Sequence, residues 1–164
     1  MTLERYLHVY HHVHGLGYAV ARVSNPFGPH QRHGTGQGVV AALLHCAITR
    51  SPFTISGDGS VVRDYFHVHD LVEALVRLAQ HEGAEQVFNI GSGVGTSLNA
   101  MVELVEAATA RPIECIYRPG RAIDAPVNVL DIGRAGRELG WRAETPLEVG
   151  LAQTFDWMVQ RHQL

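Results

Sequence analysis

The chain has 164 residues, of which 46% are hydrophobic and 18% are charged, and its formal net charge is -3. These values indicate one folded domain with a core and exclude a disordered chain. The weak negative charge argues against binding to nucleic acid or to an anionic membrane. No apolar stretch approaches the roughly 20 residues that a membrane span needs. We expect Cys46 and Cys115 to be buried thiols in a reducing compartment, which favours a cytoplasmic protein.

The first predicted element is a helix over residues 2–14 that ends at Gly15. Its apolar residues share one side, and it contains four histidines. His8 and His12 have the i, i+4 spacing of a metal-binding pair. A zinc site needs further ligands and none is evident nearby, so an exposed histidine-rich helix is favoured over a metal site.

Residues 18–23 are short and mostly apolar, which predicts a strand in a buried parallel sheet. The sequence Ser-Asn-Pro-Phe-Gly-Pro follows at residues 24–29 and predicts an irregular loop. In open α/β sheets, ligands bind at the carboxyl ends of the strands, where this loop begins. From local sequence alone, Asn25 is best interpreted as an amide that caps a turn. A polar loop over residues 30–38 and a helix over residues 39–49 come next.

The central stretch is residues 62–70, Val-Arg-Asp-Tyr-Phe-His-Val-His-Asp. It follows a strand over residues 53–56 and a tight Gly-Asp-Gly turn, so it predicts a second strand that leads into a helix. Asp70 is expected to cap this helix, with Glu73 completing a capping box. Arg63 could bind a phosphate or carboxylate. The alternative is an Arg63–Asp64 pair in a solvated turn.

The rest of the chain predicts two further strands, at residues 86–90 and 113–117, and three helices, which begin near Leu98, Asp131 and Pro146. The glycine-rich loop at residues 91–97 is unlike a dinucleotide-binding loop, because Thr96 stands where that motif needs glycine. The sequence therefore predicts an α/β protein.

Residues 57–70 resemble the extended short-chain dehydrogenase/reductase family, and more narrowly its NAD-dependent nucleotide-sugar epimerases and dehydratases. The family pattern there is Gly-Asp-Gly, Arg-Asp-aromatic, His-Val and an Asp that opens a helix. Residues 22–29 match its Arg-x-x-Asn-x-aromatic-Gly-Pro element, and residues 121–124 match its Arg-x-x-Asp. The resemblance implies a Rossmann-like fold, of which this chain would form the last strands of the parallel sheet and the small substrate-binding domain.

The resemblance also implies a site for a nucleotide-diphosphate sugar, with a UDP-sugar as the expected ligand. The implied substrate-binding residues are Asn25, Gln37, Gly38, Arg63, Tyr65, Arg121 and Asp124. The implied contacts to NAD in a complete enzyme are Ser24, Asn25 and Pro26. Two guanidinium groups can hold a diphosphate, and an aspartate can accept hydrogen bonds from ribose. On residues alone, Arg121 and Asp124 could equally form a surface ion pair.

The matching motifs belong to the C-terminal half of the family pattern. The family's glycine-rich dinucleotide loop and its catalytic Tyr-x-x-x-Lys have no counterpart in this sequence, and Glu4 matches a position just after that motif. We therefore expect a substrate-binding portion, spanning residues 1–164, that is inactive and binds no NAD by itself. It would self-associate, as a homodimer or otherwise, through surfaces left uncovered. The alternative is a stand-alone, non-catalytic domain that binds nucleotide sugars or a partner.

Overall fold

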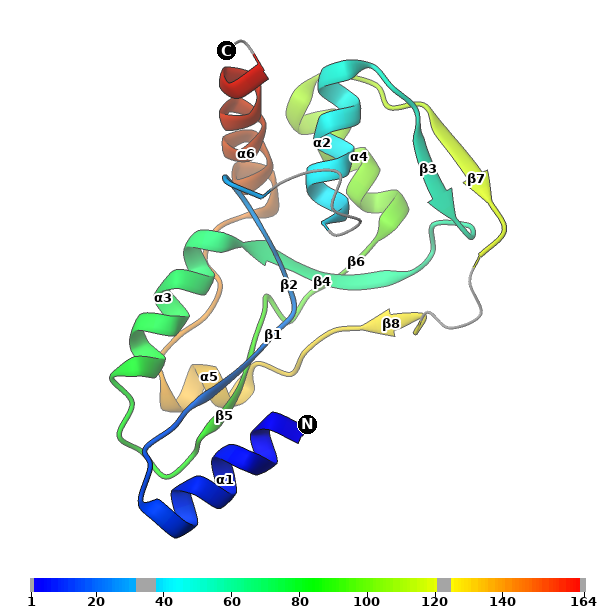
Figure 1. Cartoon of the computed structure of the whole chain (residues 1–164). Coiled ribbons are helices and arrows are strands. Elements are labelled where there is room, and N and C mark those ends of the chain that lie inside the picture. Colours follow the sequence, from blue (N-terminus) through cyan, green and yellow to red (C-terminus); the bar gives the residue numbers. More distant parts are fainter. Residues whose placement is uncertain (1, 32–37, 121–124, 163–164) are drawn as a thin grey trace.

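Helices and strands alternate along most of the chain in its computed structural model, which describes residues 2–31, 38–120 and 125–162 (Figure 1). The elements in chain order are α1 (Thr2–His14), β1 (Val20–Val23), β2 (Asn25–Phe27), α2 (Val39–Thr49), β3 (Phe53–Ser56), β4 (Val62–His67), α3 (Val68–Ala79), β5 (Val87–Ile90), β6 (Gly95–Ser97), α4 (Leu98–Thr109), β7 (Cys115–Arg118), β8 (Val127–Asn128), α5 (Gly133–Glu138) and α6 (Leu147–His162). The expected α/β class is confirmed.

The strands form three small sheets, and most of their pairings are parallel. β1 pairs with β5, and β3 pairs with β7. In the third sheet β4 is central: it pairs in parallel with β2 and β8, and antiparallel with β6. β4 therefore joins segments from four separate regions of the chain.

β4 also lies between two hydrophobic cores. Tyr65 belongs to the core that α2, α4 and α6 form with β3. Phe66 belongs to a second core, which contains Phe88 of β5 and Trp141. Successive side chains of a strand point to opposite faces, so one strand can serve both cores. Figure 1 shows α2, α4 and α6 together at one end of the molecule and β1, β5 and α5 at the other.

The start of α3 corrects the expectation that Asp70 caps this helix. The N-cap residue is His67, whose side chain accepts a hydrogen bond from the backbone N–H of His69. Asp70 is buried in the first turn, and its carboxylate accepts hydrogen bonds from the backbone N–H and the hydroxyl of Thr145. The carboxylate thus connects α3 to the segment before α6, a long-range contact that the local spacing did not predict.

α1 has the predicted bounds, and Gly15 follows it with a φ of 68°. None of its described residues is buried, and its apolar residues Leu3, Tyr6 and Val13 are more than half exposed. The apolar side predicted for this helix therefore has no covering element among the described residues.

The two cysteines are only half-buried, which corrects the expectation of fully buried thiols. Burial still raises the pKa of the Cys115 thiol. Within the described ranges, the structure has no helix with the length and apolar character of a membrane span.

Candidate functional site

A cavity of about 710 Å³ lies where β2 and β4 meet the beginnings of α2 and α4. Cavities of this size hold drug-sized ligands. The side chains and backbone around it belong to Ser24, Asn25, Pro26, Phe27, Gln31, Gly38, Val39, Val40, Val61, Arg63, Tyr65 and Leu98. The six predicted site residues that the structure describes are all among them. Gln37, Arg121 and Asp124 lie outside the described residues.

Asn25 is held by strand pairing and not by a turn. It lies opposite Tyr65 in the parallel β2–β4 ladder, and its Nδ2 donates a hydrogen bond of 3.0 Å to the carbonyl of Asp64. The expectation of a turn-capping amide is therefore wrong. Because the amide nitrogen faces β4, the amide oxygen is available as an acceptor for a ligand.

Arg63 is the one charged side chain among the described residues around the cavity. Its Nη1 donates 2.8 Å hydrogen bonds to the carbonyls of Val62 and Ala125. A guanidinium has five N–H donors, so these two bonds orient the group and leave other donors for an anionic ligand.

Asp64 does not pair with Arg63 in a solvated turn, so that alternative is wrong. Its side chain is fully buried and accepts hydrogen bonds from the backbone N–H groups of Ser92, Gly93 and Leu130 and from the Ser92 hydroxyl. These bonds compensate the cost of burying a carboxylate. The two adjacent charged residues therefore point into different surroundings, as alternation along a strand requires.

Tyr65 is almost fully buried, with 5% of its surface exposed. Burial raises the pKa of its phenol, and the nearby charge of Arg63 opposes this effect. The phenol is therefore protonated at neutral pH and can donate a hydrogen bond to a ligand, but it is a poor general base.

Among the described residues, two at the cavity have buried polar atoms without a hydrogen-bond partner in the described part of the chain: the hydroxyl of Ser24 and the Oε1 of Gln31. Unpaired buried polar groups are rare in folded proteins and often mark a ligand site. Sequence reasoning predicted Ser24 but missed Gln31, which lies in a polar loop without a distinctive local pattern.

The start of α2 also faces the cavity. Gly38, the N-cap residue, has a φ of 87° and no side chain, so the first N–H groups of the helix have no side-chain cap. These groups carry partial positive charge and can bind an anionic or carbonyl oxygen. Val39, Val40 and Leu98 supply an apolar wall beside them, which sequence reasoning also missed.

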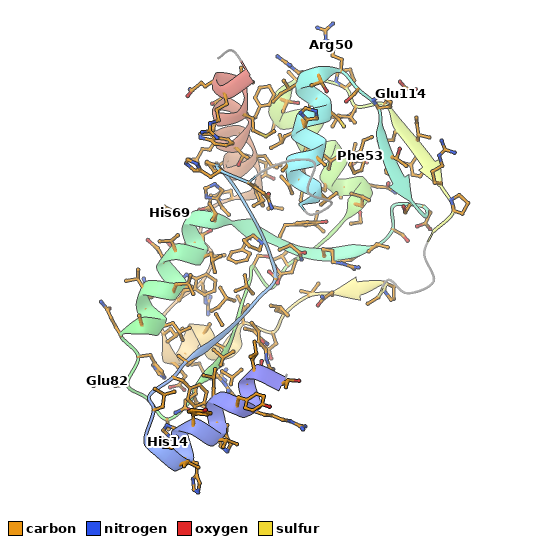
Figure 2. All side chains as sticks on the ribbon, viewed as in Figure 1. His14, Arg50, Phe53, His69, Glu82 and Glu114 are labelled. Atoms are coloured by element: carbon orange, nitrogen blue, oxygen red, sulfur yellow. The ribbon has the colours of Figure 1, made fainter. Side chains whose placement is uncertain are left out.

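A larger hollow of about 980 Å³ lies elsewhere, between the ends of α1 and α3. Figure 2 shows His14 and Glu82 at this end of the molecule and Arg50 and Glu114 at the opposite end. The described residues around the hollow include Glu82 and Glu85 but no arginine or lysine, so its charge does not suit a diphosphate. None of the predicted site residues that the structure describes borders it.

The histidines of α1 form no metal site in the part of the chain that the structure describes, where no three metal-ligating side chains come together. His11 instead makes a hydrogen bond between its Nδ1 and the carbonyl oxygen of Leu16 and contacts the ring of Tyr18.

Residues 1–91 match the sequence model of the NAD-dependent epimerase/dehydratase family. The chain belongs to this family. Over 160 residues it is 34% identical to a UDP-glucose 4-epimerase of Mycolicibacterium smegmatis, and this match covers 98% of this chain and 51% of that protein. It is 35% identical over 130 residues to a dTDP-4-dehydro-6-deoxyglucose reductase of Escherichia coli, covering 79% of this chain and 41% of the relative. The chain spans about half the length of the curated relatives it matches, or less.

Solved structures of epimerases have the same fold. The UDP-glucose 4-epimerase of Thermotoga maritima, solved with UDP-glucose, matches with a TM-score of 0.93 at 36% identity over 98% of this chain and 52% of that one. The UDP-glucose 4-epimerase of Thermus thermophilus, solved with NAD, matches with a TM-score of 0.86 at 30% identity over 96% and 51% of the two chains. The predicted family and its Rossmann-like fold are therefore confirmed.

Proposed function

We propose that residues 1–164 of this epimerase/dehydratase-family chain bind a nucleotide-diphosphate sugar, with UDP-sugars as the ligand class. The observation that supports this most is one cavity that combines Arg63, Asn25, Tyr65 and the uncapped start of α2. Arg63 would bind the diphosphate, and the apolar wall beside the helix start would accept the base. Arg121 and Asp124 would complete the diphosphate and ribose contacts.

The proposed reaction of an enzyme that contains this chain is the epimerisation of a sugar at C4 through a transient keto sugar. NAD would accept the hydride and return it. The described residues fit one end of this cofactor. The buried hydroxyl of Ser24, directly after β1, has no hydrogen-bond partner among them, so the carboxamide of a bound nicotinamide could pair with this hydroxyl. Ser24, Asn25 and Pro26 would therefore hold the nicotinamide end. Neither a pyrophosphate-binding loop nor a Tyr-x-x-x-Lys occurs in the printed sequence, so we propose that this chain is inactive alone.

The alternative is a stand-alone domain that binds sugar nucleotides without catalysis. Both proposals require UDP binding, so the reading frame upstream of Met1 separates them. A Tyr-x-x-x-Lys in the same frame would favour an enzyme portion, and its absence would favour the stand-alone domain.

Calorimetric titration of the chain with UDP, dTDP, GDP and NAD tests the proposal. We expect UDP to bind and NAD to give no measurable heat. Arg63→Ala should weaken UDP binding roughly 10- to 150-fold, because a hydrogen bond to a charged group contributes about 1.5–3 kcal/mol. In a complete enzyme, Arg63→Ala and Arg121→Ala should each raise the KM for the sugar nucleotide.

Arg142→Ala is the matched control, since Arg142 is exposed and lies outside this cavity. It should leave UDP affinity unchanged. Equal affinity of wild type and Arg63→Ala would show that the assigned site is wrong, and micromolar NAD binding would contradict the proposed division of the cofactor site.

A further inference from the structure

Asp64 is a fully buried carboxylate between two residues of the proposed site, Arg63 and Tyr65. Its Oδ1 accepts hydrogen bonds from the backbone N–H of Ser92 at 2.8 Å and from the Ser92 hydroxyl at 2.6 Å. Its Oδ2 accepts from the N–H of Gly93 at 3.2 Å and of Leu130 at 3.3 Å. Both oxygens therefore accept hydrogen bonds from donors held by the backbone or by Ser92, which fixes the orientation of the side chain.

The segment of residues 125–130 runs along β4 and is held at both ends by neighbouring residues of that strand. At one end, Nη1 of Arg63 donates to the carbonyl of Ala125 at 2.8 Å. At the other, the N–H of Leu130 donates to Asp64. Between these points, β8 pairs with β4, and the N–H of Val62 donates to the carbonyl of Pro126.

This arrangement links the buried carboxylate to the guanidinium at the cavity. The carbonyl of Ala125 orients Arg63. The position of this carbonyl along β4 depends on the segment of residues 125–130, which Asp64 anchors through Leu130. Loss of the Leu130 bond would remove one of the contacts that fix this segment along β4, beside the β8–β4 pairing and the Val62–Pro126 bond, and would thereby loosen one of the two acceptors that orient Arg63.

We propose that Asp64 is a positioning residue of the sugar-nucleotide site, which acts through Arg63. It holds residues 125–130 against β4, so that the Ala125 carbonyl orients the Arg63 guanidinium toward the diphosphate. This inference rests on the proposed function, because it assigns Arg63 a ligand. If Asp64 had a purely structural role, its replacement would lower the stability of the chain, and any effect on UDP affinity would not depend on Arg63.

A double-mutant cycle on the chain distinguishes these roles, with UDP affinity measured by calorimetry in wild type, Asp64→Asn, Arg63→Ala and the double variant. The amide of Asp64→Asn would present N–H groups to two backbone donors, so we expect UDP binding about tenfold weaker. If Asp64 acts through Arg63, the same substitution should change UDP affinity less than about twofold in the Arg63→Ala background. Equal losses in both backgrounds would overturn the inference.

Asp58→Asn is a matched control, because Asp58 accepts from the N–H and hydroxyl of Ser60 at 2.9 and 2.6 Å in an exposed turn. It should leave UDP affinity unchanged. If Asp64→Asn does not fold, Ser92→Ala replaces it in the cycle, since this variant removes a single 2.6 Å bond to the carboxylate. If the wild-type chain binds no UDP, the proposed function and this inference are both wrong. If it binds UDP but the two substitutions lower the affinity independently of each other, the inference alone is wrong.

Discussion

Glu4 of α1 and Arg22 of β1 form a bidentate ion pair across 18 residues of sequence. The Nε and Nη2 atoms of Arg22 donate to the two carboxylate oxygens of Glu4 at 2.8 and 2.6 Å. This hydrogen bonding lowers the pKa of Glu4 and raises that of Arg22. Because α1 buries no described residue, this pair is a main connection between the helix and the strand that leads into the site.

We therefore expect Glu4→Gln to loosen α1 without unfolding the rest of the chain. Amide hydrogen exchange should become faster across residues 2–14 and stay unchanged in α4, with only a small change in the midpoint of global unfolding. Glu85→Gln is the control, because Glu85 pairs with Arg134 at 2.7 Å and neither residue belongs to α1. Unchanged exchange in α1 after Glu4→Gln would show that the pair does not hold the helix.

Gly91, which directly follows β5, closely approaches Asp64 of β4 and Ser24, which directly follows β1. A Cβ at this position would lie 2.5 Å from the Asp64 Oδ2 and 2.7 Å from the Ser24 hydroxyl. Gly91→Ala should lower the free energy of unfolding by about 1–3 kcal/mol, as overpacking in a core does. Urea denaturation measures this change.

Gly17→Ala provides the comparison for Gly91, since a Cβ there would meet nothing within 4 Å. A glycine that can adopt an ordinary conformation is usually neutral or stabilising when replaced by alanine, by about 0.4–1 kcal/mol. Similar stabilities of Gly91→Ala and Gly17→Ala would contradict the predicted crowding at the strand ends.

His67 should make the stability of the chain depend on pH. It is buried, its Nε2 has no hydrogen-bond partner in the described part of the chain, and its ring packs against Phe27. Burial lowers the pKa of His67, Asp70 opposes this, and His69 adds to it. Below the ordinary histidine pKa of about 6.5, the unfolded chain therefore binds more protons than the folded chain. The stability should be highest above that pH and should fall as the pH drops from 7 to 5.

Thermal unfolding between pH 7.5 and 5 tests this sign. His67→Gln should flatten the loss of stability on acidification, whereas His69→Gln, at an exposed position beside it, should change the profile little. The prediction fails if the two variants and wild type lose stability in parallel.

The exposed apolar side of α1 predicts self-association. Leu3, Tyr6, Val9, Tyr10 and Val13 are between 52% and 78% exposed. Neighbouring apolar side chains on an exposed helix favour contact with a second apolar surface, here that of another copy. Sedimentation velocity should show dimers or larger species, and Tyr6→Glu should weaken association by about tenfold or more.

Val94→Glu serves as the control for association, because Val94 is 63% exposed but lies in the loop before β6. It should leave the association unchanged. If the wild-type chain sediments as a single monomeric species at high protein concentration, the predicted association through the apolar side of α1 is wrong.

The local sequence of this chain determined its elements and its family, because turn glycines, apolar periodicity and short motifs act over a few residues. It predicted β3, α2 and six of the residues around the cavity, including Arg63 and Asn25, since these lie in short motifs.

The tertiary structure alone decided what the buried polar side chains bind. Asp70 looked like a helix cap, yet it bonds Thr145, 75 residues away, and Asp64 looked like a surface charge, yet it anchors Leu130, 66 residues away. A carboxylate can accept from any donor that the fold brings near, and the sequence around it does not specify that donor. Short motifs therefore pointed to six of the residues around the cavity, whereas long-range packing determined which side chains hold them in place.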